Sequence, residues 1–164
     1  EYSKVIPIWK FSLLSLATLG IYEVFWFYRT WKFFKLKDGL KIRPFWRALF
    51  GIIWCDSLAT KIKRLVKSKG IPCRYSPLLI SVSYILTNVS VTISFNYRNF
   101  SPIFDLIAYL DFLLLVPLVV SMNKYWQREQ PDLPVKKLLW WQKFLIIIGL
   151  SIFFFITVRS FLPK

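Results

Sequence analysis

Acidic side chains inside apolar segments are the residues of this sequence best suited to chemistry. Of the 8 Asp and Glu residues, Glu23, Asp105 and Asp111 lie within long apolar runs. An ionisable group is costly to hold in apolar surroundings, so each of the three is a candidate for a functional role. Asp105 lies near the outer interface and can be hydrated there, whereas burial would favour the protonated form of Asp111 and allow coupling to a proton or a cation.

Asp111 is the most isolated of these acids. It lies between Leu110 and Phe112, and no Lys or Arg lies within two helical turns of it along the sequence. We therefore expect its partner on another helix, with Asn88 or the nearby hydroxyl side chains as candidates. A structural hydrogen bond is one interpretation. The other is a protonated Asp111 that couples to a proton or a cation during transport.

The apolar run from about residue 77 to 97 carries polar side chains on two helical faces. Asn88 shares one face with Ser81 and Thr92. The other face has the 4, 3, 4 spacing of a helical stripe and consists of Ser83, Thr87, Ser90 and Ser94. Such a helix should be packed inside a bundle, where neighbouring helices satisfy its polar groups. The alternative is a helix that lines a polar path or buried network together with Asp111.

A basic and aromatic region follows Glu23. Trp and Tyr side chains anchor helices at the level of lipid head groups, and basic pockets beside spans bind anionic head groups. We expect Glu23 to form an ion pair here, with Arg47 as one candidate partner. The residues predicted to contact lipid head groups or the interface are Glu23, Trp26, Arg29, Trp31, Lys32, Arg43, Trp46 and Arg47.

Familiar catalytic and metal-binding patterns are absent from the sequence. It contains no His, so a His-based catalytic triad is excluded, and it carries no Gly-rich phosphate loop. Cys55 and Cys73 do not form a CxxC pair and are expected to be free thiols. Asp105 and Asp111 lie about 120° apart on a helix, so they do not form a paired-carboxylate site by themselves. We predict no metal and no cofactor.

Composition and charge indicate a membrane protein. Hydrophobic residues make up 56% of the 164 residues, aromatic residues make up 20%, and the net charge is +15. A basic excess occurs in nucleic-acid-binding proteins and on the cytoplasmic flanks of membrane spans. The basic residues here lie at the ends of long apolar runs, which favours the membrane interpretation and argues against a nucleic-acid partner.

The apolar runs predict an all-α, integral membrane helical bundle in a single domain, residues 1–164. About four transmembrane helices are expected, at residues 7–28, 77–97, 103–123 and 138–158, because each run is long enough to cross the hydrocarbon core. Residues 44–69 predict one interfacial or re-entrant amphipathic helix that Pro44 opens, and the alternative is a cytoplasmic helix packed on its own protein. Asp38-Gly39 should end the first helix, Pro117 should kink the third span or loosen its backbone hydrogen bonds, and residues 124–137 should form a loop.

The distribution of Lys and Arg predicts the topology. Residues 29–74 and 124–143 together hold 18 of the 23 basic residues, and Lys4 and Lys10 belong to the remaining 5. Cytoplasmic loops carry the excess of Lys and Arg. With four spans, this distribution predicts that both termini lie outside the cytoplasm.

Residues 13–66 carry an ordered aromatic motif. It consists of Thr18-Leu-Gly-Ile-Tyr22, Phe25-Trp-Phe-Tyr28, Trp31-Lys32 and Pro44-Phe-Trp-Arg-Ala48. In this third of its length the chain resembles a group of small bacterial inner-membrane proteins with no assigned activity. The resemblance implies a location in the bacterial inner (plasma) membrane and supplies no catalytic residue.

Three functions follow as hypotheses. The first is a non-enzymatic binding, regulatory or accessory subunit, for example an immunity-type protein, whose basic and aromatic cytoplasmic face contacts anionic lipid, a protein partner or a second copy. The second is a small transporter or channel that uses Asp111 and the hydroxyl-lined second span. The third is a lipid-modifying membrane enzyme. A polar central axis would favour the second, and a lateral groove with a head-group site would favour lipid binding or lipid chemistry.

Overall fold

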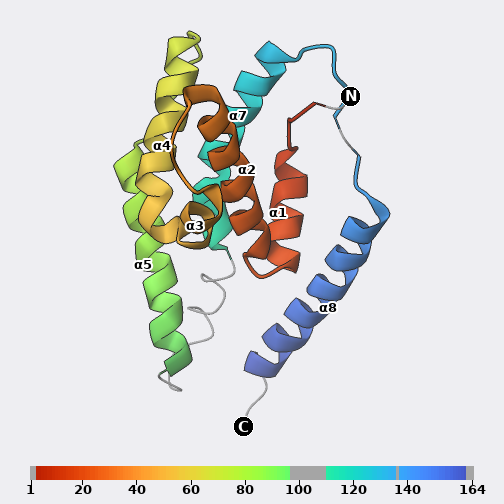
Figure 1. Cartoon of the computed structure of the whole chain (residues 1–164). Coiled ribbons are helices and arrows are strands. Elements are labelled where there is room, and N and C mark those ends of the chain that lie inside the picture. Colours follow the sequence, from red (N-terminus) through yellow and green to blue (C-terminus); the bar gives the residue numbers. More distant parts are fainter. Residues whose placement is uncertain (1–2, 97–109, 136, 162–164) are drawn as a thin grey trace.

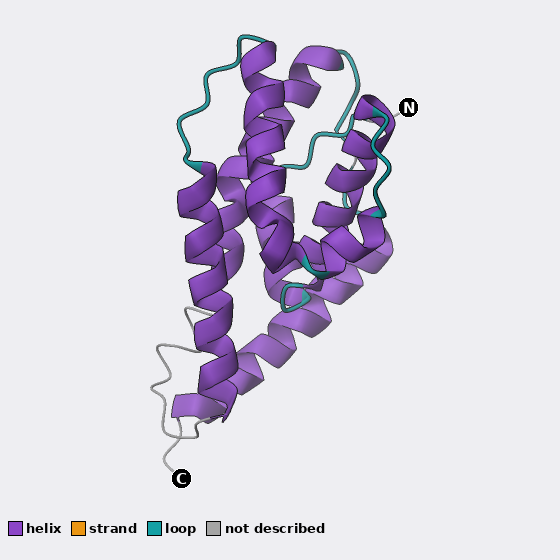
Figure 2. Cartoon of the chain, turned by 60° about the vertical axis from the view of Figure 1, so that its left-hand side comes forward, coloured by secondary structure: helices purple, strands orange, loops and turns teal. Residues whose placement is uncertain are grey.

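The computed structural model describes residues 3–96, 110–135 and 137–161 of the chain (Figure 1). Side chains at positions 91–96, 141, 152–153 and 155–161 lie outside this description. Within the described part every named element is helical, and the only bridge between extended backbones joins Ser3 and Val135. The predicted all-α fold is therefore confirmed for these residues, as the secondary-structure colours in Figure 2 also show.

The first expected helix is two helices, α1 (Ile8–Ala17) and α2 (Ile21–Asp38). The prediction of one continuous helix across residues 7–28 is wrong because Leu19 and Gly20 adopt positive φ angles of 50° and 87°. The ring of Phe11 packs against Trp26 with 5.9 Å between ring centroids. A contact between positions this far apart on either side of the turn requires that α2 runs back along α1.

Local hydrogen bonds explain where this turn forms. The hydroxyl of Thr18 donates to the carbonyl of Leu14 at 2.7 Å and accepts the backbone N–H of Tyr22 at 2.9 Å. Thr18 thus closes the end of α1 and satisfies a free donor in the first turn of α2. Gly20 tolerates the left-handed conformation because it has no Cβ. At the other end, α2 stops at Asp38, and Gly39 follows with φ 61°, as predicted.

The helix expected over residues 44–69 bends at Phe50, giving α3 (Pro44–Leu49) and α4 (Gly51–Ser68). Phe50 leaves helical geometry with φ −95° and ψ 42°. The bend lets Gly51 approach the buried ring of Phe27, where a Cβ would lie 3.7 Å from the ring. The prediction that Pro44 opens this segment is confirmed, and the prediction of one straight helix is wrong.

The second half of the chain contains α5 (Pro77–Asn96), the short 3-10 helix η1 (Asp111–Leu115), α7 (Val116–Glu129) and α8 (Trp140–Phe161). Residues 103–109 of the expected third span, including Asp105, lie outside the described residues. Pro117 lies in the first turn of α7, where the backbone changes from 3-10 to α geometry, and not within a kinked helix. The helix continues to Glu129, so the loop predicted to begin at residue 124 is shorter.

The core lies where α2, α4, α5, η1 and α7 meet (Figure 1). Trp31, Phe27 and Leu58 are almost completely buried in it, and so are Ile62 and Leu115. Helix α8 packs on α1, and at their crossing a Cβ on Gly149 would overlap the backbone carbonyl of Ala17. The approach of the two backbones therefore depends on the missing side chain of Gly149.

The chain has a basic end and an apolar end. We define the basic end as the C-terminal halves of α2, α4 and α7, at the top of Figure 1. The apolar end comprises the α1–α2 turn, the α3–α4 bend and the lower parts of α5 and α8. Among the described residues, no helix has both the length and the apolar character needed to cross a membrane.

The N-terminal segment lies at the basic end. The Lys4 ammonium lies 4.5 Å from the centroid of a Trp126 ring, and the Ile6 N–H donates to Asn123 Oδ1 at 2.9 Å. Lys4 was expected on the opposite side from the basic segments of residues 29–74 and 124–143. That expectation is wrong, because α1 and α2 form a hairpin that returns the chain to the same end. Lys37 of α2 approaches the same end of α7, 5.9 Å from the ring centroid of Tyr125.

Candidate functional site

A buried acidic cluster lies between α2, α5 and η1. Its centre is Glu23, whose exposed fraction is 2% although a carboxyl group is rarely buried. The hydroxyl of Tyr84 on α5 donates to Glu23 Oε2 at 3.0 Å. The hairpin positions this carboxyl, because Glu23 follows directly on the turn and faces the second half of the fold.

Asp111 forms the other side of this cluster. Its Oδ2 accepts a hydrogen bond from Asn88 Nδ2 at 3.4 Å, and the same amide donates to the Tyr84 carbonyl at 2.9 Å. The backbone N–H of Phe112 also donates to the Asp111 carboxylate. The prediction that Asp111 finds its partner on another helix, with Asn88 as a candidate, is confirmed.

Glu23 and Asp111 lie close enough for their carboxyl groups to interact electrostatically. Two neighbouring carboxylates repel each other, and burial disfavours the charged form of each, so we infer that the pair holds one proton. Asp111 receives an amide donor, whereas Glu23 Oε1 receives no donor among the described residues. We therefore infer that Glu23 carries the proton.

Glu23 does not form the ion pair expected from the sequence. The ion pairs among the described residues join Lys61 to Asp38 at 3.2 Å and Lys69 to Glu129 at 2.7 Å. Arg47, the expected partner, lies 4.6 Å from the ring centroid of Trp31 and 4.2 Å from that of Trp54. Sequence proximity to many cations was misleading because α2 turns Glu23 toward the core and away from them.

Hydroxyl groups of the α5 stripe make hydrogen bonds within their own helix. Thr87 donates to the carbonyl of Ser83 at 2.9 Å, and Ser90 donates to that of Leu86 at 2.8 Å. These bonds remain within α5, which is the usual way for a helix to satisfy its own hydroxyl groups. Ser83, Thr87 and Ser90 are half-buried, and the side chain of Ser94 lies outside the described residues.

The residues predicted to contact head groups separate into buried and exposed sets. Trp26 and Trp31 are 3% and 0% exposed, so their predicted interfacial position is wrong. They belong to the core because α2 is covered by α1 on one side and by α3 and α4 on the other. The exposed members are Arg29, Lys32, Arg43 and Trp46, and Arg47 is half-buried between two Trp rings.

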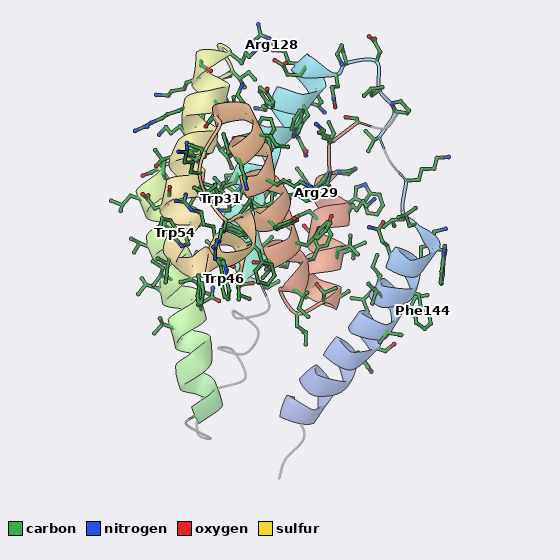
Figure 3. The ribbon with its side chains drawn as sticks, in the orientation of Figure 1. Arg29, Trp31, Trp46, Trp54, Arg128 and Phe144 are labelled. Atoms are coloured by element: carbon green, nitrogen blue, oxygen red, sulfur yellow. The ribbon has the colours of Figure 1, made fainter. Side chains whose placement is uncertain are left out.

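Figure 3 shows this division around α2. Trp31, Trp46 and Trp54 lie toward α3 and α4, whereas Arg29 lies toward α1. Trp46 is 49% exposed and stacks on Phe50 with 6.1 Å between ring centroids. The aromatic residues of the sequence motif therefore serve two purposes: some fill the core, and others form an exposed aromatic surface at the α3–α4 bend.

Two groups near the acidic cluster were missed from the sequence. Tyr84 lies one helical turn before Asn88, and this i, i+4 spacing on a polar face is the signal that could have found it. Cys55 of α4 is fully buried, so it is a core thiol that reagents in solution do not reach. Cys55 and Cys73 are both free, as expected.

Comparisons with known proteins give no family for the chain. No family model, curated protein or solved structure matches it. Among the described residues, no group of His, Cys, Asp and Glu side chains is arranged to hold a metal ion. Inference about function therefore rests on the chemistry of the surface and of the buried cluster.

Proposed function

We propose that the chain is a membrane-embedded, non-enzymatic binding or accessory protein of the bacterial inner membrane. In this proposal the apolar end lies in the bilayer and the basic end lies against anionic head groups and the cytoplasm. One observation carries it: large hydrophobic side chains are exposed on every element of the apolar end.

These exposed side chains form extended surfaces and are not scattered singly. Soluble monomers rarely expose continuous apolar patches larger than a few hundred Å². The α3–α4 bend alone exposes six large hydrophobic residues in a short stretch, namely Phe45, Trp46, Leu49, Phe50, Ile52 and Ile53. Helix α5 exposes Leu78, Leu79, Val82, Ile85, Leu86 and Val89, and α8 exposes Trp140, Phe144, Leu145, Ile147, Ile148 and Phe154.

The basic end has the opposite character. Its exposed or half-buried cations, with Lys69 directly after α4, are Lys32, Lys35, Lys37, Lys61, Lys63, Arg64, Lys67, Lys69, Lys124 and Arg128. An excess of Lys and Arg marks the cytoplasmic side of a membrane protein and attracts anionic lipids. The division of the molecule into an apolar and a basic end supports an orientation perpendicular to the bilayer.

The hairpin changes the proposed topology. Residues 7–28 turn back at Leu19 and Gly20, so we assign the α1–α2 turn and the α3–α4 bend to re-entrant positions. Residues 77–97 and 138–158 remain the proposed crossings, together with residues 103–123. The N-terminus is then on the cytoplasmic side with the basic end, and the C-terminus is on the other side.

Cysteine accessibility tests this proposal at two matched positions. Leu36 at the basic end is 75% exposed, and Ile53 at the bend is 70% exposed. Leu36→Cys and Ile53→Cys would be made separately in the Cys73→Ser variant, where Cys55 remains as a buried control. In inverted membrane vesicles, a membrane-impermeant maleimide should label Leu36→Cys and leave Ile53→Cys unlabelled. Equal labelling of the two positions, or release of the protein by alkaline carbonate, would contradict the proposal.

The carboxyl pair of buried Glu23 and half-buried Asp111 favours a second candidate function, proton-coupled transport. Two neighbouring carboxyl groups that hold one proton are the kind of group that proton relays use inside membranes. In proteoliposomes with an imposed pH difference, the chain would conduct protons and Asp111→Asn would abolish the flux, while the exposed Asp38→Asn would not change it. Equal fluxes in empty and loaded liposomes would reject this function.

A further inference from the structure

A cleft lies between the N-terminal segment, α1, α2 and the start of α8. Its volume is about 170 Å³. The residues that line it are Ser3, Lys4, Val5, Ile6, Lys10, Tyr22, Phe25, Arg29, Leu139 and Gln142. They come from segments far apart in the sequence, so the cleft exists only because α2 turns back on α1 and α8 returns to pack on α1.

The cleft gathers positive charge. Lys4 and Arg29 bring two exposed cations to it beside the buried Lys10, and no Asp or Glu is among the described residues that line it. Lys10 is 7% exposed, and its ammonium donates to the Lys137 carbonyl at 3.3 Å. Like charges that converge in a partly buried space repel one another more strongly than in water, and a bound anion relieves this repulsion.

Aromatic faces hold two of these cations without neutralising them. The Arg29 guanidinium lies 5.8 Å from the ring centroid of Phe25, and Lys4 lies over Trp126. A cation over an aromatic ring keeps its charge and most of its hydrogen-bond donors. Arg and Lys side chains in this condition are suited to a phosphate group, which accepts several charge-assisted hydrogen bonds.

The walls of the cleft are fixed by hydrogen bonds. Asn123 holds the Ile6 peptide at both groups, because it accepts from the Ile6 N–H at 2.9 Å and donates to the Ile6 carbonyl at 2.6 Å. The Ser3 N–H donates to the Pro134 carbonyl at 3.0 Å, and the Gln142 side chain accepts from the Leu139 N–H at 3.1 Å. A site fixed before binding loses less entropy when the ligand enters.

We propose that this cleft binds the phosphate group of an anionic phospholipid. The proposal rests on the proposed membrane location and identifies its head-group site. Phe25, at one wall, is 50% exposed, and Trp140, beside Leu139 on α8, is 80% exposed. These apolar surfaces next to the cations provide a place for acyl chains, which a soluble phosphate compound would not use.

Lipid retention by the full chain in mild detergent tests the proposal. Native mass spectrometry would compare phosphatidylglycerol with phosphatidylcholine on the unaltered chain, on Arg29→Gln and on Lys41→Gln. Lys41 is the control, because it is also an exposed cation and does not line the cleft. We expect preferential retention of phosphatidylglycerol, a loss of about tenfold in Arg29→Gln and no change in Lys41→Gln. Equal retention by the two variants would overturn the proposal.

Two additional measurements separate the possible causes. Lys4→Gln, an exposed change at the opposite wall, should also weaken retention, and thermal unfolding of each variant confirms that it is folded. Inorganic phosphate should displace phosphatidylglycerol from the unaltered chain. If inorganic phosphate bound in an Arg29-dependent way and no lipid were retained, the proposal that the bound phosphate belongs to a phospholipid would be wrong. Equal labelling at Leu36→Cys and Ile53→Cys would reject the membrane location alone.

Discussion

The acidic cluster and the basic cleft each contain one ionisable side chain of α2, and the two side chains have different surroundings. Glu23 and Arg29 are both on α2, and the six-residue spacing directs them to different sides of the helix. Glu23 is buried among protein groups, and the Tyr84 hydroxyl donates to one of its carboxyl oxygens. Arg29 lines a cleft that no described acid enters. An ionisable group that hydrogen bonds within the protein, as Glu23 does, contributes to stability. A cation that lines a cleft without a described acid, as Arg29 does, is available to an anionic ligand.

Removing Glu23 should give the largest effect on stability. Glu23→Ala leaves the Tyr84 hydroxyl and the Asp111 carboxylate buried without their partner, which should lower the free energy of unfolding by about 3 kcal/mol. Glu23→Gln should cost less than about 1 kcal/mol, because the Gln side chain accepts from Tyr84 and donates to Asp111 as a protonated Glu does. Chemical denaturation in detergent checks both values. A Gln variant as unstable as the Ala variant would contradict the shared proton.

Gly149→Leu should break the cleft and leave the acidic cluster intact. A side chain at position 149 would overlap the Ala17 backbone, so α8 must move away from α1, at a cost of about 2 kcal/mol. Because α8 supplies one wall of the cleft, retention of phosphatidylglycerol should fall as well. Ser151→Leu, two residues along α8 at an exposed position, is the control and should retain both stability and lipid. The same outcome for both variants would argue against the α1–α8 crossing.

Tyr84→Phe sharpens the comparison inside the acidic cluster. The change removes the hydroxyl that donates to Glu23. It keeps the ring, whose centroid lies 6.3 Å from the ring centroid of Phe27. We expect a loss of about 1 kcal/mol in the free energy of unfolding and unchanged lipid retention. A Tyr84→Phe variant that lost lipid would show that the two clusters are coupled through α2.

Lys69→Gln should have the smallest effect. The ion pair between Lys69 and Glu129 lies at the surface, with side chains 42% and 35% exposed, and water and salt screen such pairs. We expect no measurable change in unfolding midpoint, lipid retention or membrane location. The variant therefore measures the background against which the other three are judged. A clear loss of lipid in Lys69→Gln would assign head-group binding to the whole basic end and not to the cleft.

Much of the local structure could be predicted because its causes are local. Pro44 and Pro77 open helices, Asp38-Gly39 closes one, and Asn88 pairs with Asp111 as its spacing and isolation suggested. The two breaks were missed because apolar periodicity continues across them. The signals were weak: a Gly two residues after Thr18, and a Gly next to Phe50, each in a hydrophobic run.

The positions of the charges were predicted poorly. Arg47, expected near Glu23, lies between Trp rings, and Lys4, expected far from Lys37, lies at the same end of the molecule. Both errors have one cause. A side chain's neighbours depend on the direction of its helix, and the turn at Leu19 and Gly20 reverses that direction for α2.

The sequence by itself determined the helical class, most helix starts, the strongly basic character and the identity of the acids that need partners, because composition, Pro and Gly act locally. Only the tertiary structure decided that Glu23 and Asp111 meet in one cluster and that Lys4, Lys10 and Arg29 converge on one cleft. Both arrangements join segments distant in the chain. They form because packing around α2 sets which face of each helix is buried, and no short stretch of sequence contains that information.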